Sequence, residues 1–196
     1  MFFKDVISKL INIQLKKHMI EKENVDLIEY GYWLLFEIIF NLFFSLLIGL
    51  LFRDVKNVVL FMLLYIPLRT YSGGWHANKM WICMIISNVV IAAEELILKY
   101  MIHSVVVWWY LPILFVFIII TVRKSPIDTD AKVLTDKEKI VYKGIIKKIV
   151  IIHSLILCIC IMLQNRQGTL LFEYVYTIQV IMLLAEIMCK KRKYIG

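Results

Sequence analysis

Six long apolar runs, separated by short polar segments, dominate this sequence. They cover approximately residues 31–52, 55–70, 80–98, 101–122, 147–163 and 169–187. A helix needs about 20 residues to cross the hydrocarbon core of a bilayer, so runs of this length predict membrane-spanning helices. The second run is short, and we expect its helix to tilt or to end in a half-buried loop that lines a polar cavity. The pattern therefore predicts an all-α, polytopic membrane protein with about six transmembrane helices.

A different pattern precedes the first run. Within residues 2–20, apolar side chains recur at helical spacing and lysines occupy the polar positions: Phe3, Val6, Ile7, Leu10 and Ile13 against Lys9, Lys16 and Lys17. This stripe predicts an N-terminal amphipathic helix at the membrane interface. A cytoplasmic helix packed on the protein's own core would bury the same stripe, so both arrangements stay open. Residues 21–29 are expected to form an acidic connector to the first span.

The composition agrees with a membrane protein. The 196 residues are 61% hydrophobic, and their mean hydropathy of +0.79 is well above that of a soluble domain. With the N-terminus in the cytoplasm, 19 of the 23 lysines and arginines lie inside and four lie outside: Arg53, Lys56, Lys99 and Arg166. This asymmetry predicts a multi-pass protein of the cell membrane with both termini cytoplasmic. The basic clusters flank the spans and suit anionic lipid head groups, which argues against a nucleic-acid partner.

This topology divides the chain into three segments. Residues 1–30 form a cytoplasmic or interfacial segment, residues 31–187 form the six-helix transmembrane domain, and residues 188–196 form a basic cytoplasmic tail. The opening residues lack the pattern of a cleavable signal, so we expect the first span to direct insertion. The cysteines, at positions 83, 158, 160 and 189, have a spacing that fits neither a disulfide framework nor a zinc site. We expect reduced thiols, no bound metal and no cofactor.

The candidate chemistry lies where the second run ends, in the sequence RTYSGGWHANKMWIC from Arg69 to Cys83. Gly73 and Gly74 can adopt backbone angles denied to other residues, so this pair predicts a sharp turn that ends the preceding helix. His76 can take a proton near neutral pH. Cys83 follows seven residues later and is a nucleophile once it is ionised.

The seven-residue spacing of His76 and Cys83 restricts how the two could act together. On one straight helix their side chains would lie roughly 10 Å apart, too far for proton transfer. A pair therefore needs a bend, with His76 in the loop and a new helix that begins near residues 77–79. Cys83 would then lie near free N–H groups and the positive end of the helix dipole, which favour a thiolate. The alternative is that both are packing residues near the membrane surface.

Neighbouring polar residues are candidates to support this pair. Arg69 could bind a peptide carboxylate or polarise a scissile carbonyl, or it could simply anchor the end of its span. Ser72 is a further polar neighbour. The cytoplasmic loop 123–148 is strongly basic, and that charge could be purely topological. Three of its residues could instead hold a charged peptide near the pair: Asp128, Asp130 and Lys132.

Two further features concern the spans themselves. Thr135 and Glu138 have the spacing of a capping box, which predicts the start of the helix that continues into the fifth span. Acidic residues inside spans are energetically costly and are therefore candidate functional residues. They are Glu37, Glu94, Glu95, Glu173 and Glu186. Glu94 and Glu95 lie near the outer end of the third span, beside Lys99. We expect a paired or snorkelling role for these two rather than chemistry.

Taken together, these motifs resemble the accessory gene regulator protein B family, membrane peptidases that mature cyclic autoinducing peptides. The matching residues are Arg69, Gly73, Gly74, His76, Ala77 and Cys83, followed by Ser125, Pro126, Ile127, Asp128 and Lys132. The resemblance implies that Cys83 is the nucleophile and His76 its base, and that they cleave the C-terminal part of a short precursor peptide of the AgrD type. It further implies acyl transfer to a cysteine or serine of the precursor, which closes a thiolactone or lactone ring, and a homodimeric protein.

Two other classes of function stay open on the sequence alone. Six spans with buried glutamates would also suit an exporter of small peptides, whose activity would not depend on Cys83. A non-catalytic membrane regulator, such as a partner of a sensor kinase, would cut no peptide. The response of peptide cleavage to loss of Cys83 distinguishes these classes from a cysteine peptidase.

Overall fold

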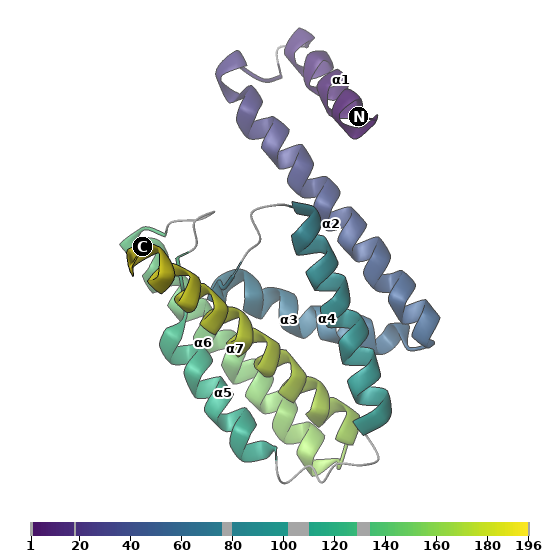
Figure 1. Ribbon diagram of the computed structural model, residues 1–196, viewed down its shortest axis with the longest axis vertical. Coiled ribbons are helices and arrows are strands. Elements are labelled where there is room, and N and C mark those ends of the chain that lie inside the picture. The colour runs from purple at the N-terminus through teal and green to yellow at the C-terminus, as the bar shows by residue number, and fades with distance from the viewer. Residues whose placement is uncertain (1, 18, 76–79, 102–109, 129–133, 196) are drawn as a thin grey trace. The chain divides into compact units, whose positions relative to one another are not determined.

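The computed structural model describes residues 2–17, 19–75, 80–101, 110–128 and 134–195. Its helices are α1 (Phe2–Lys16), α2 (Val25–Phe52), α3 (Val55–Ser72), α4 (Met80–Met101), α5 (Leu111–Lys124), α6 (Asp136–Met162) and α7 (Arg166–Ile195), with a 3-10 turn at Lys22–Asn24. Every regular element in these ranges is helical (Figure 1). The predicted all-α class is therefore confirmed.

Each of the six predicted spans corresponds to one helix, from α2 to α7. Four of these helices are long and apolar enough to cross a membrane over their described residues: α2, α4, α6 and α7. The helix α3 has 18 residues and includes Lys56 and Arg69, and the described part of α5 has 14. The helix α2 begins at Val25, so residues 25–29 are its first turn and not the expected connector.

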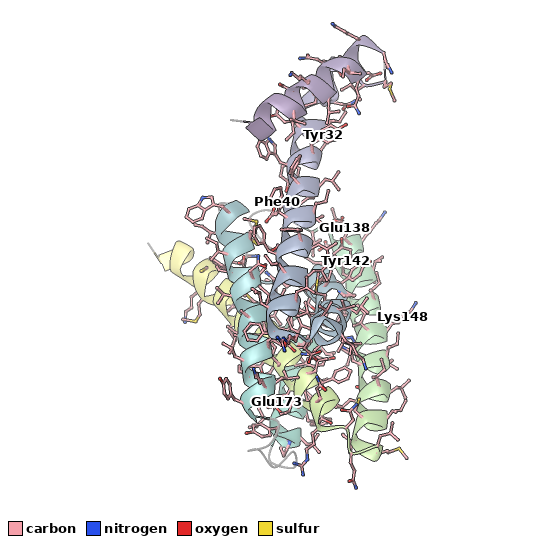
Figure 2. The ribbon with its side chains drawn as sticks, turned by 90° about the vertical axis from the view of Figure 1, so that its right-hand side faces the viewer. Tyr32, Phe40, Glu138, Tyr142, Lys148 and Glu173 are labelled. Atoms are coloured by element: carbon pink, nitrogen blue, oxygen red, sulfur yellow. The ribbon has the colours of Figure 1, made fainter. Side chains whose placement is uncertain are left out.

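Residues 1–45 form one compact unit, which contains α1 and the first part of α2. A hydrogen bond of 2.6 Å from the Gln14 side-chain amide to the Tyr32 hydroxyl joins the two helices. Ile7 and Ile11 are buried, whereas Leu10 and Ile13 of the same apolar stripe are exposed. Part of the stripe therefore packs within the protein, and part stays open to another surface. Tyr32 and Phe40 are labelled on α2 in Figure 2.

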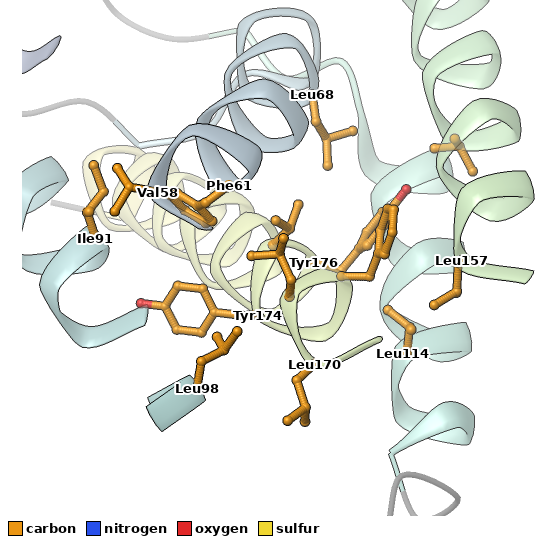
Figure 3. Packing of buried hydrophobic residues seen from close by; sticks show 14 of the residues in the cluster. Val58, Phe61, Leu68, Ile91, Leu98, Leu114, Leu157, Leu170, Tyr174 and Tyr176 are labelled. Atoms are coloured by element: carbon orange, nitrogen blue, oxygen red, sulfur yellow. The ribbon is translucent and has the colours of Figure 1, made fainter. Parts of the chain in front are cut away.

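Residues 46–196 form the second unit, in which α7 is the central helix. It contacts α3, α4, α5 and α6. In the most hydrophobic 18-residue stretch of α7, 56% is buried inside the protein, against 22% or less in the corresponding stretches of the other candidate spans. Phe172, Val175 and Tyr176 of α7 are almost completely enclosed. They pack against apolar side chains of the surrounding helices, including Phe61, Leu68, Leu114 and Leu157 (Figure 3).

The outer faces of this second unit are apolar. Large hydrophobic side chains are exposed along α4 and α6, among them Ile85, Val89, Ile151, Ile152 and Leu155. A water-soluble protein of this size rarely exposes so much contiguous apolar surface, whereas a lipid bilayer would cover it. Together with the four candidate spans, this surface establishes that the chain is a membrane protein.

Hydrogen bonds define the two ends of the second unit. At one end the Gln167 side chain donates to the Asp54 carboxylate at 3.3 Å, which joins the start of α7 to the start of α3. At the other end, the Ile127 amide donates to the Ser72 carbonyl at 3.1 Å, which joins the segment after α5 to the last residue of α3. The helices α3 and α7 therefore begin at one end of the unit, and α3 and α5 end at the other.

Which end of the unit faces the cytoplasm stays a prediction from the charge pattern, and labelling tests it. We expect Arg166→Cys, at the start of α7, to react with a membrane-impermeant maleimide in intact cells that carry a variant without the native cysteines. Lys137→Cys, at the start of α6, should react only after the cells are opened, because both positions are exposed and the charge pattern predicts that they lie on opposite sides of the membrane. Labelling of Lys137→Cys from outside would contradict the predicted orientation.

Candidate functional site

The Gly73–Gly74 pair ends α3 in a turn that other residues would strain. Gly73 has φ 72° and Gly74 has φ 128°, and the Gly73 amide donates to the Arg69 carbonyl at 3.1 Å. A Cβ atom on Gly73 would lie 2.5 Å from the carbonyl oxygen of Ile127. A Cβ atom on Gly74 would collide with the Arg69 guanidinium and lie 3.2 Å from the backbone of Met182. Both glycines are thus required by dihedral angle and by close approach.

The Arg69 side chain folds back over this turn. Its Nη1 atom donates to the Gly73 carbonyl at 2.5 Å, and its Nη2 atom donates to the Trp75 carbonyl. The planar guanidinium can serve both acceptors at once because its N–H groups form a rigid fork. In this structure Arg69 therefore stabilises the turn that follows its own helix, a role that sequence reasoning did not consider.

The central helix α7 holds the same turn from the other side. The Trp75 amide donates to the Met182 carbonyl at 2.9 Å, and the Gln179 side chain donates to the Gly73 carbonyl at 3.2 Å. Glu186, one turn further along α7, is buried and lies within electrostatic range of Arg69. Sequence reasoning did not single out Gln179. The available signal was a lone amide side chain within the apolar run 169–187.

The segment after α5 contacts the turn through its backbone and α6 through a side chain. The Ile127 amide binds the Ser72 carbonyl, and the Asp128 carboxylate forms a 2.9 Å ion pair with Lys139. The hydrogen bond from Lys139 lowers the pKa of Asp128. This ion pair therefore stabilises the fold above the unfolded pKa of Asp128 and is lost as the pH falls through its lower folded value. Asp130 and Lys132 lie outside the described residues.

Cys83 is the fourth residue of α4. Cys83 is half-buried and forms no disulfide. It lies within electrostatic range of both Arg69 and Tyr65. The structure thus brings Cys83, Arg69 and the Gly73–Trp75 turn into one region. His76 lies outside the described residues, between Trp75 and the start of α4.

The two neighbouring acids of α4 lie near its opposite end. The Asn57 side-chain amide donates to Glu94 at 2.5 Å and to Glu95 at 3.3 Å, and all three residues are buried. These acids are therefore paired with Asn57 of α3, and the alternative of a snorkelling role is wrong because both side chains are buried. Glu94 lies 11 positions after Cys83, about 16 Å along the helix axis. The described residues contain no group of three His, Cys, Asp or Glu side chains that could hold a metal ion.

These features define an all-α, polytopic membrane protein with a cysteine at the start of a span, beside a turn that is fixed by arginine and glycine. The family model described as Accessory gene regulator B matches residues 7–188. The chain belongs to this family, and the resemblance noted in its sequence is thereby confirmed. Membership supports a part for the chain in the accessory gene regulator system, in the processing of quorum-sensing peptides.

Individual relatives agree with this assignment. A putative AgrB-like protein of Clostridium perfringens strain SM101 is 27% identical over 170 residues, which cover 83% of this chain and 79% of that protein. A putative AgrB-like protein 2 of strain 13 matches to the same extent. Protein FsrB of Enterococcus faecalis is 33% identical over 61 residues, 31% of this chain and 25% of that protein. No solved structure shows a significant match.

The close packing of the turn predicts a strong difference between two glycines. Gly73→Ala should lower the free energy of unfolding by at least about 2 kcal/mol, because its positive φ is strained for alanine and the new Cβ would meet the Ile127 carbonyl. Thermal denaturation in detergent measures this loss. Gly144→Ala is the control, because Gly144 lies within α6 and has no atom within 4 Å of the Cβ position. It should stabilise the helix slightly, and equal effects of the two changes would contradict the explanation.

Proposed function

We propose that this protein is a membrane cysteine endopeptidase that cleaves a short signalling-peptide precursor and promotes its cyclisation. The observation that carries this proposal is the location of Cys83, in a chain of this family, at the start of α4 and in electrostatic range of Arg69. The N–H groups at the start of a helix and a nearby guanidinium can stabilise negative charge on a sulfur atom as it attacks. A thiolate is the form of cysteine that attacks a carbonyl carbon.

The proposed reaction has two acyl transfers. Cys83 Sγ attacks the scissile carbonyl, the peptide C–N bond breaks, and the leaving amine takes a proton while the N-terminal part stays bound as a thioester. His76 is proposed to accept the thiol proton and to pass it to the amine. A thiol or hydroxyl of the same peptide then attacks the thioester, which closes the ring and releases Cys83. No water is consumed, so a half-buried site at the membrane suits the chemistry.

The surrounding residues are proposed to position these two groups. Arg69, Gly73 and Gly74 build the turn that leads into His76, and the Ser72 backbone joins it to the segment after α5. Asp128 is proposed to keep that segment on α6 through Lys139. Lys132 is proposed to hold a charged part of the peptide.

The partners and the domain organisation complete the proposal. Residues 31–187 are proposed to form the peptidase domain, with its site on the cytoplasmic face, between the N-terminal segment 1–30 and the basic tail 188–196. An AgrD-type precursor would then reach the site from the cytoplasm. The bilayer would cover the apolar faces of the helices, and a second copy of the chain is proposed to complete a homodimer.

Loss of the nucleophile provides the decisive test. With purified protein in vesicles and a synthetic precursor peptide of the AgrD type, Cys83→Ala should reduce cleavage to background while membrane insertion is unchanged. His76→Gln should also fail, because it keeps a hydrogen-bonding side chain of similar size but cannot transfer the proton. Mass spectrometry should detect a peptide thioester on the wild-type protein only.

The other cysteines serve as matched controls. Cys158→Ala, Cys160→Ala and Cys189→Ala should each keep most of the activity, since they remove thiols far along the chain from the turn. Normal cleavage by Cys83→Ala would refute the peptidase proposal. If that variant also carried the peptide across the membrane normally, an exporter, for which the buried Glu94 and Glu95 would be relevant, would be favoured instead.

A further inference from the structure

Gln179 is a completely buried amide in the central helix that the proposed chemistry does not use. It is 0% exposed, and it shares one face of α7 with the apolar residues Phe172, Val175 and Leu183, at helical spacing. Its Oε1 atom has no hydrogen-bond partner among the described residues. Burial of an amide that is only partly bonded is unfavourable, and an aliphatic side chain would pack here more easily. The one side-chain hydrogen bond that Gln179 forms to a described residue therefore needs an explanation.

That bond goes to the Gly73 carbonyl, which also accepts from Arg69. The two donor distances are 3.2 Å from Gln179 Nε2 and 2.5 Å from Arg69 Nη1, and the two lone pairs of a carbonyl oxygen can accept both. The two donors have different structural effects. Arg69 belongs to α3, the helix that ends at this turn, so its hydrogen bonds fix the shape of the turn. Gln179 belongs to α7, so it fixes where the turn lies on the central helix.

A second link lies one helical turn further along α7. The Trp75 amide donates to the Met182 carbonyl at 2.9 Å, and the Trp75 carbonyl accepts from Arg69. Gly74 lies between the two links and approaches the Met182 backbone so closely that a Cβ atom would be 3.2 Å away. Gln179 and Met182 are three residues apart and therefore lie on neighbouring parts of one face. The segment from Gly73 to Trp75 is thus held on α7 at two points.

We propose that Gln179 is a positioning residue of the proposed active site. It holds the Gly73 carbonyl, and with Met182 it fixes the backbone of Trp75, the residue that directly precedes His76 in the sequence. The position of the Gly73–Trp75 turn, and with it the Arg69 guanidinium near Cys83, then depends on a hydrogen bond from the central helix. This inference rests on the proposed function. A displacement of about 1 Å between catalytic groups can reduce a rate by about 100-fold, so one such hydrogen bond can affect catalysis strongly.

Gln179→Met tests the hydrogen bond with little change in length, and Gln179→Leu tests it with a second apolar side chain. Gln167→Met is the matched control, because Gln167 lies on the same helix and also donates one side-chain hydrogen bond, to Asp54 at the other end of the unit. Each change is made in a variant in which Cys83 is the only cysteine. The measurements are precursor cleavage, the pH dependence of Cys83 alkylation by iodoacetamide, and thermal stability.

We expect both Gln179 variants to slow cleavage about tenfold or more and to change the pH profile of alkylation in the same direction as His76→Ala. Gln167→Met should match the parent protein in both assays. The inference is overturned if the Gln179 variants alkylate like the parent, even when their stability falls, or if all three changes act alike. Alkylation needs no substrate, so it still tests the role of Gln179 if Cys83→Ala shows that the peptidase proposal is wrong.

Discussion

The hydrogen bonds of the turn after α3 are the constraint on which the candidate site depends. A helix that ends in a partly buried site leaves backbone groups with limited access to water, and a partner within the chain stabilises each of them. Here the Gly73 and Trp75 carbonyls accept from Arg69, and the Trp75 amide donates to α7. The same bonds that satisfy the backbone also fix the Gly73–Trp75 turn beside α7. The hydrogen bonds that stabilise this turn therefore also shape the candidate site.

The position of α7 explains why polar residues lie within an apolar run. An amide or a carboxyl that faces lipid finds no hydrogen-bond partner, but a helix that contacts four others can direct such groups toward particular neighbours. Gln179 binds the turn after α3, and the Tyr174 hydroxyl donates to the Val90 carbonyl of α4 at 2.7 Å (Figure 3). Apolar surfaces can slide along one another, whereas these hydrogen bonds specify a single register.

The sequence predicted the features that depend on neighbouring residues. The apolar runs predicted the helices, the glycine pair predicted the turn, and the spacing of Thr135 and Glu138 predicted the capping box that the structure contains. The early start of α2 was missed because acidic residues resemble a connector, although such residues also favour a first helical turn. The roles of Gln179 and Asn57 were missed for another reason. Their partners are 106 and 37 residues away in the sequence, so no local pattern can reveal the contact.

The position of Cys83 also depends on contacts near the far end of α4. Only about a fifth of the most hydrophobic stretch of this helix is buried. Apolar packing alone therefore defines weakly how far α4 is shifted along its axis relative to α3 and α7. Asn57 holds the Glu94 carboxyl at one end, and the Tyr174 hydroxyl binds one turn before it. A helix is stiff over the intervening distance of about 16 Å, so contacts near Glu94 also determine where Cys83 lies beside Arg69. The polar contacts of α3 and α7 with α4 thus act on the candidate site without touching it.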